Sequence, residues 1–176
     1  MAPESIREYN EPMSSFDETE EGSLSIWEGP HRDKKYIVGA DVALGVRGDY
    51  SVATVINKDR EICAIYRSNR IDPVRFGRMI FYLGRWYNNA LVCPESNSIG
   101  LATVQQLFGM NYPNIYMQKK TANTAGDNVN HLGFKTTMST RPPIISNLRR
   151  MIEDEDIMIP CAMLLDELRN FIVTES

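Results

Sequence analysis

Cysteine, histidine and long hydrophobic runs are all scarce in this sequence. Its 176 residues include 3 cysteines and 2 histidines, so no cluster of the kind that holds zinc is visible. The cysteines lack CxxC spacing, which excludes a disulfide scaffold and predicts buried free thiols in a reducing compartment at Cys63, Cys93 and Cys161. No apolar run approaches the roughly 18–20 residues of a membrane span, and we expect no membrane association.

An excess of positive charge is also missing, because the formal net charge is −4. This balance excludes indiscriminate phosphate binding by the whole chain, although it leaves room for a local basic face. Residues 1–23 are acidic and polar, and we expect them to form a flexible linker rather than a signal peptide. The length and the 43% hydrophobic content suit one domain, which we expect to span 24–176.

Three apolar segments near the start of that domain predict an antiparallel meander. They cover 35–43, 50–57 and 61–67, and short polar turns separate them. The first segment is apolar at consecutive positions, which predicts a central strand buried on both faces.

Helices and short strands alternate after the meander. Asp72 followed by Pro73 is typical of a helix start, since aspartate can cap the first turn and proline fits its first position. Apolar residues at helical spacing predict that this helix packs on the sheet, and a short apolar run predicts a buried strand over 90–94. Further helices, each with an apolar side, are predicted over 100–108, 142–154 and 161–173. The order indicates an α/β protein with a mixed sheet.

Two acidic residues stand at the ends of apolar strands, where an unpartnered carboxylate is costly to bury. Asp41 lies near the end of the first strand, and Glu95 follows the fourth. If these strands are parallel neighbours, both carboxylates reach the crevice at the carboxyl ends of the strands, where α/β sheets bind ligands. A divalent cation would remove their repulsion, and oxygen ligands favour Mg²⁺ or Mn²⁺ over zinc. Asp49, beyond the turn at Gly48, is a third candidate ligand.

Ordinary structural roles compete with a metal site at each of these positions. An aspartate at the end of a strand is a common turn former, and Glu95 could simply cap the helix that follows it. Spacing alone leaves the metal site and these local roles open as alternatives.

Six segments stand in a distinctive order between residues 24 and 173. They are LSIWEGP at 24–30, YIVGADVALGVRGDYSVATVIN within 35–57, the helix of 72–86, ALVCPESNSIG at 90–100, GFKTTMSTRPPIISNLRRMIED at 133–154 and LLDELRNFIV at 164–173. This ordered set resembles the C-terminal nuclease domain of the large terminase subunit of tailed bacteriophages. The resemblance implies an RNase H-like fold, in which a mixed sheet of three antiparallel strands followed by parallel strands is flanked by helices.

The resemblance also implies a two-metal-ion endonuclease that cuts concatemeric viral DNA during genome packaging in the cytoplasm of a bacterial host. It matches Asp41 to a catalytic aspartate that bridges two ions of Mg²⁺ or Mn²⁺, and Glu95 to an acid that holds one of them. Asp49 matches an additional aspartate of the site. The metals would activate a water for attack on phosphorus and stabilise the leaving 3′ oxygen.

The sequence departs from that family in two places. It contains no GxxxxGK[ST] phosphate loop, the mark of the packaging ATPase domain that large terminases also carry. The family's final catalytic aspartate follows the LLDELRNFIV-type helix, and the sequence stops at Ser176 before that point. We therefore expect a nuclease domain that is incomplete at its C-terminus, with weak metal binding and greatly reduced cleavage.

Basic residues gather mostly in the second half of the chain, and a nuclease needs contacts to DNA phosphates. The candidates are Arg47, Lys119, Lys120, Lys135, Arg141, Arg149 and Arg150. For each of them a solvated charged surface is the competing interpretation. By resemblance, the partners are double-stranded DNA, the packaging ATPase domain, the portal and the small terminase subunit.

Two other functions stay open. A catalytically silent fragment that binds DNA or docks to the packaging motor would fit the absent final acid. An actin-like or sugar-kinase-type nucleotide-binding domain would share the early strands and the strand-end aspartate. Its first hairpin needs a phosphate-binding turn rich in Gly, Thr or Ser, and residues 44–50 contain no threonine.

Overall fold

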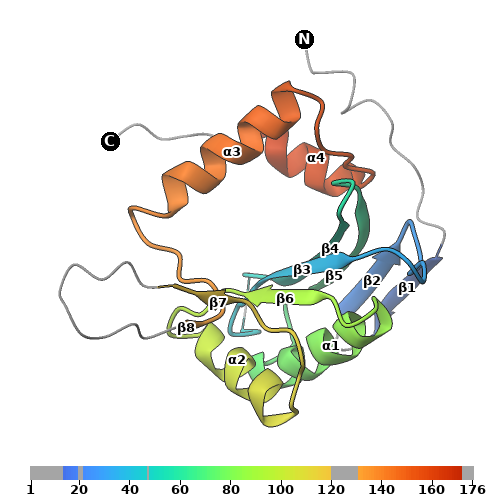
Figure 1. Ribbon diagram of the computed structural model, residues 1–176. Helices are drawn as coiled ribbons and strands as arrows, with labels where there is room; N and C mark the ends of the chain where they lie inside the picture. Colours follow the sequence, from blue (N-terminus) through green and yellow to red (C-terminus); the bar gives the residue numbers. More distant parts are fainter. Residues whose placement is uncertain (1–13, 20–21, 47, 120–130, 172–176) are drawn as a thin grey trace.

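The main sheet of the protein is mixed and has helices on both sides (Figure 1). The computed structural model describes residues 14–19, 22–46, 48–119 and 131–171. Six strands form the main sheet in the order β1-β2-β5-β4-β3-β6, and β7 and β8 form a separate two-stranded sheet. The strands are β1 Ser14–Thr19, β2 Gly22–Ile26, β3 Tyr36–Asp41, β4 Ser51–Asn57, β5 Ile62–Ser68, β6 Leu91–Pro94, β7 Met117–Gln118 and β8 His131–Leu132. The helices are α1 Pro73–Trp86, α2 Gly100–Gly109, α3 Arg141–Glu153 and α4 Ala162–Arg169.

Three antiparallel strands and one parallel neighbour form the part of the sheet that positions the candidate site. β3 pairs antiparallel with β4, and β4 with β5, as the predicted meander requires. β6 then returns beside β3 and runs parallel to it, with Gly39 opposite Cys93. This arrangement confirms the predicted α/β class and its mixed sheet.

Strands begin earlier in the chain than the sequence analysis predicts. β1 and β2 pair antiparallel, and β2 pairs with β5 from Ser23 to Ile26, so this segment extends the sheet. The predicted linker over 1–23 is therefore wrong for residues 14–19 and 22–23, while 1–13, 20 and 21 lie outside the described residues. The sequence of β1 has little apolar patterning. An edge strand does not need such a pattern, because main-chain hydrogen bonds, which residues of any polarity form, can hold it on the sheet.

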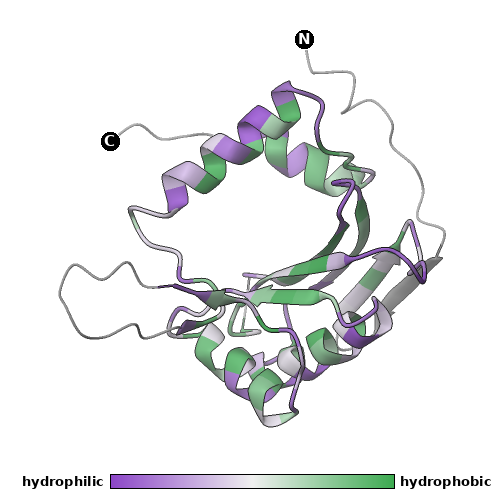
Figure 2. Cartoon of the chain, viewed as in Figure 1, coloured by the Kyte–Doolittle hydropathy of each residue, from purple (hydrophilic) through white to green (hydrophobic). Residues whose placement is uncertain are grey.

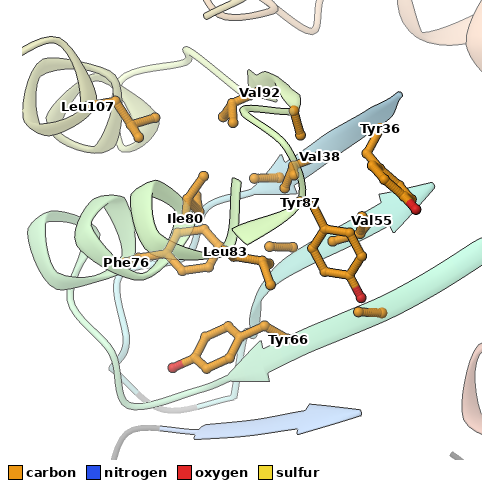
Figure 3. Close-up of a cluster of buried hydrophobic side chains, with 14 of the residues drawn as sticks. Tyr36, Val38, Val55, Tyr66, Phe76, Ile80, Leu83, Tyr87, Val92 and Leu107 are labelled. Atoms are coloured by element: carbon orange, nitrogen blue, oxygen red, sulfur yellow. The ribbon is translucent and has the colours of Figure 1, made fainter. Parts of the chain in front are cut away.

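The main hydrophobic core lies between the sheet and helices α1 and α2 (Figure 3). Asp72 caps α1 by accepting hydrogen bonds from the main-chain N–H groups of Val74 and Arg75, at 2.9 and 3.0 Å. The predicted inward side of α1 is confirmed, because its apolar residues are buried: Phe76, Ile80, Leu83 and Tyr87. Full burial of one such side chain contributes about 1.5–3 kcal/mol, so this core holds α1 firmly on the sheet.

One face of β3 is exposed, contrary to the prediction of a strand buried on both faces. Val38 and Ala40 face the core, whereas Ile37 keeps 44% of its surface exposed. Gly39 and Asp41 share that exposed face. An uninterrupted apolar run carries no period-2 signal, so the sequence cannot show which face lacks a cover.

Helix α3 lies on the open side of the sheet and buries none of its own residues (Figures 1 and 2). The side predicted to turn inward is covered only in part, because Ile144 is 47% exposed whereas Ile145, Leu148, Met151 and Ile152 are half-buried. Near the end of the helix, Ile152 is partly buried against a second, smaller core. α3 is therefore joined to the rest of the protein mainly through its C-terminal end.

The second core joins α4 to the face of β5 that α1 leaves uncovered. Its buried residues are Ile62, Ile65, Ile159, Cys161 and Leu165. All three cysteines are free thiols, as predicted. Cys63 and Cys161 are buried as expected, whereas Cys93 is only half-buried. Among the helices of the described ranges, none is long and apolar enough to cross a membrane.

Candidate active site

Asp41 and Glu95 are brought together by the parallel pairing of β3 and β6. Asp41 is the last residue of β3, and Glu95 follows β6 directly. The register places Ala40 opposite Pro94, and the Glu95 N–H donates a hydrogen bond to the Ala40 carbonyl oxygen at 2.8 Å. The two acids are thus next neighbours at the carboxyl ends of the two strands.

The two carboxyl groups interact directly. Partial burial of the Asp41 carboxyl group, a hydrogen bond shared with Glu95 and the charge of Glu95 raise the pKa of Asp41 from 3.8 to about 6. The main-chain N–H of Val42 lowers this pKa and the charge of Asp49 raises it, and both effects are smaller. The pair therefore concentrates negative charge at one point of the open sheet face.

The raised pKa predicts that removing the Asp41 charge stabilises the metal-free protein above about pH 6. Because the folded pKa lies above the unfolded value, the ionised carboxylate opposes folding above pH 6, and this cost fades as the pH falls toward 3.8. Since water screens this partly exposed group, we expect Asp41→Asn to raise the free energy of unfolding by only ~1 kcal/mol at about pH 8 in EDTA. Near pH ~4 most of that gain should be gone. Urea titrations at the two pH values measure it, and an equal gain at both would contradict the charge argument.

Asp49 stands apart from this pair. It is an exposed residue of the loop between β3 and β4, and it acts on Asp41 through its charge. No three His, Cys, Asp or Glu side chains within the described ranges lie close enough together to hold a metal ion. The structure thus joins two of the three candidate ligands and leaves the third outside the cluster.

Two adjacent carboxylates fit a hard divalent cation. Unit charges about 4 Å apart repel by ~4 kcal/mol at an effective dielectric constant of about 20, and a cation between them offsets this repulsion. Mg²⁺ keeps several of its waters and is commonly bound through one or two carboxylates, so two carboxylates are enough protein ligands for one such ion. Their donor atoms are all oxygens, which favours Mg²⁺ or Mn²⁺ over zinc.

Main-chain hydrogen bonds hold Glu95 from its other side as well. The Ser96 N–H donates to the Phe134 carbonyl oxygen, and the Phe134 N–H donates to the Pro94 carbonyl oxygen, each at 2.8 Å. At the start of α2, the Gly100 N–H donates a hydrogen bond to the side-chain oxygen of Asn97 at 3.3 Å, so the side chain that caps this helix is that of Asn97. The alternative role of Glu95 as a helix cap is therefore excluded.

Two glycines let neighbouring segments pass close to Glu95. A Cβ atom at Gly100 would collide with the Glu95 carbonyl oxygen, and one at Gly133 would lie 2.6 Å from the Pro94 oxygen. Gly133 also has a φ angle of 81°, a conformation that favours glycine. Neither residue is among the site residues predicted from the sequence. The available signal was a glycine at the first position of the helix that follows the Glu95 strand.

The basic residues predicted to contact DNA differ in their exposure and in whether they form ion pairs. Three are exposed: Lys119, Lys135 and Arg141. Two form ion pairs with acids of the same segment, Arg149 with Glu153 at 2.8 Å and Arg150 with Asp154 at 3.8 Å. Their charge is thus partly compensated within and just after α3. The remaining two lie outside the described residues: Arg47 and Lys120.

The sheet order and the flanking helices define an RNase H-like α/β fold. No known protein-family profile matches the sequence. Among solved structures, the chain is similar to the large terminase nuclease from thermophilic phage G20c with bound zinc, at 21% identity and a TM-score of 0.68, over 96% of this chain and 86% of that one. The large terminase nuclease domain of Thermus phage P74-26 matches at 21% identity and a TM-score of 0.66, over 96% of this chain and 76% of that one. The chain therefore has the fold of large terminase nuclease domains.

Proposed function

We propose that this chain is the metal-dependent nuclease domain of a large terminase, which hydrolyses phosphodiester bonds of concatemeric viral DNA during genome packaging. The observation that carries the proposal is the contact between Asp41 and Glu95 at the carboxyl ends of β3 and β6. The shared fold supports it, and structures of the phage G20c nuclease contain magnesium, cobalt or zinc.

In this proposal Asp41 and Glu95 hold Mg²⁺ or Mn²⁺, and Asp49 contributes a further negative charge at the rim. When bound, such an ion lowers the pKa of a water that attacks phosphorus and stabilises the leaving oxygen. The protein determines where this happens, because the register of β3 and β6 sets the separation of the two acids. The exposed face of β3 gives the DNA backbone access to them. Exposed basic side chains contact other phosphates of the DNA, and the candidates are Lys119, Lys135 and Arg141.

We also propose the partners of this domain. Double-stranded DNA is the substrate, and the packaging ATPase domain, the portal and the small terminase subunit are the protein partners, in the cytoplasm of a bacterial host. These partners follow from the sequence resemblance to large terminases, and the shared fold supports the same assignment.

A plasmid-nicking assay tests the nuclease function. With Mn²⁺ or Mg²⁺ the chain should convert supercoiled plasmid into open-circular and linear forms, and EDTA should stop the conversion. DNA binding should persist in EDTA, since contacts of basic side chains to phosphates do not require the metal. Plasmid that stays supercoiled with every divalent ion, although the chain binds it, would contradict the nuclease function.

DNA binding without nicking would favour the second candidate function, a DNA-binding or motor-docking domain that does not cut DNA. One observation supports it: in the part of the chain that the structure describes, Asp41 and Glu95 have no third acid in their cluster. Two-metal nuclease sites need more ligands than two carboxylates supply, so a domain with this pair alone could bind DNA without cleaving it.

A further inference from the structure

A small polar pocket opens at the same end of the sheet as Asp41. Its volume is about 190 Å³, well above the ~30 Å³ that one water molecule takes in the liquid. Two arginines and no carboxylate are among its lining residues, which include Ser23, Tyr50, Arg67, Asn69 and Arg70. We propose that this pocket binds a phosphate group of the DNA, at a distance from the bond that is cut. This inference rests on the proposed nuclease function and assigns the enzyme a second point of contact with its substrate.

The register of the sheet places Arg67 on the same face as Asp41. Residues that pair across neighbouring strands point to the same face, and Asp41 pairs with Val52, which pairs with Arg67. Ser23 of β2 is the next member of this row, because it pairs with Arg67. Neighbouring strands lie ~4.8 Å apart, so Arg67 is about 10 Å from Asp41 across the sheet. The pocket and the carboxylates therefore belong to one face.

Arg67 is held in place by neutral neighbours. Its guanidinium lies over the ring of Tyr50, 3.6 Å from the ring centroid, and it donates to the sulfur of Met163 in α4. No ion pair joins Arg67 or Arg70 to an acid of the described ranges, in contrast to Arg149 and Arg150 of α3. A stacked guanidinium that keeps several N–H donors is preorganised to bind phosphate oxygens, for which arginine has the matching planar geometry.

Arg70 and Asn69 belong to the turn that leads from β5 into α1. The Ser68 hydroxyl fixes this turn by accepting hydrogen bonds from the N–H groups of Arg70 and Ile71, each at 3.1 Å. Two cations that line one pocket repel each other, and a bound anion offsets that repulsion. Phosphates of one DNA strand wind around the helix axis as well as rising about 3.4 Å per step along it, so neighbouring phosphates lie farther apart than this rise. A pocket about 10 Å from Asp41 therefore suits a phosphate about one or two steps from the one that is cut.

Binding measurements in a cleavage-deficient background test this site. The parent protein carries Asp41→Asn, so that anisotropy of a fluorescein-labelled DNA duplex reports binding without cutting. Arg70→Gln should weaken binding about tenfold and reduce the slope of log affinity against log salt concentration by about 1, because one phosphate contact is lost. Arg67→Gln should do the same, and its thermal unfolding shows whether the lost stacking on Tyr50 has damaged the fold.

Arg78→Gln is the matched control, because Arg78 is an exposed arginine of α1, the helix that packs on the opposite face of the sheet. It should leave both the affinity and the slope at the values of the parent. If Arg70→Gln and a folded Arg67→Gln bind DNA with the affinity and salt slope of the parent, the phosphate site is contradicted, even when the wild type nicks plasmid. The expected losses of binding in a chain that does not nick plasmid would support the site and contradict the nuclease function.

Discussion

Replacing Asp41 with Asn is expected to lower the rate of Mn²⁺-dependent plasmid nicking by about 1000-fold. The amide keeps the shape of the side chain but removes the negative charge that, next to Glu95, would attract the metal. A bound ion contributes several kcal/mol to stabilising the transition state, and a loss of about 4 kcal/mol corresponds to about 1000-fold. Rates of nicking at one fixed, subsaturating Mn²⁺ concentration, measured for variant and wild type, provide the comparison.

Asp33→Asn is the matched control, since Asp33 is an exposed aspartate of the segment before β3. This substitution removes one carboxylate charge at a position outside the candidate site, so the variant should nick plasmid at the wild-type rate. Asp41→Asn should still bind DNA and unfold cooperatively. An Asp41→Asn protein that retains more than about a tenth of the wild-type rate would mean that the metal binds elsewhere.

Replacing Gly100 with Ala is expected to damage the site indirectly, through the position of Glu95. The added Cβ atom meets the main-chain carbonyl group of Glu95, which cannot rotate away as a flexible side chain would. Either the start of α2 or Glu95 itself must move. Overpacking costs about 1–3 kcal/mol, and a shift of about 1 Å at a catalytic group can cost about 100-fold in rate. We therefore expect the free energy of unfolding to fall by ~2 kcal/mol and the nicking rate to fall about 100-fold.

Gly109→Ala separates this collision from the general effect of alanine in a helix. Gly109 is the last residue of α2, and a Cβ atom there would meet nothing within 4 Å. Alanine is the better helix former, so this variant should be as stable as the wild type or slightly more stable, with unchanged nicking. Urea unfolding and plasmid nicking of both variants are the measurements. If Gly100→Ala matched Gly109→Ala in both, the close approach to Glu95 would have no importance for the site.

The elements next to the site could be predicted from the sequence because short local signals specify them. Asp72 and Pro73 mark the start of α1, and the apolar run before Glu95 marks β6. The contact between Asp41 and Glu95 required one further assumption, that their strands are parallel neighbours. The register of β3 and β6 confirms that assumption.

The exposure of side chains and the neighbours of a residue across the sheet could not be predicted from local signals. Ile37 and Ile144 are apolar and look like core residues, yet both are substantially exposed because α3 does not pack closely on β3. The row that joins Asp41 to Arg67 depends on pairing across three strands, and no local pattern contains that information. Arg67 is therefore not recognisable from the sequence as a residue of this face.

The pairing of β6 with β3 also determines when, during folding, the two acids can first meet. β4 and β5 are joined by a short turn and β3 and β4 by the loop over 42–50. Antiparallel hairpins of neighbouring strands form within about 1–10 μs. β6 can reach β3 only after the chain has closed back across the whole of β4, β5 and α1, which costs more loop-closure entropy and is slower. We therefore expect Asp41 and Glu95 to come together late, after the antiparallel part of the sheet has formed.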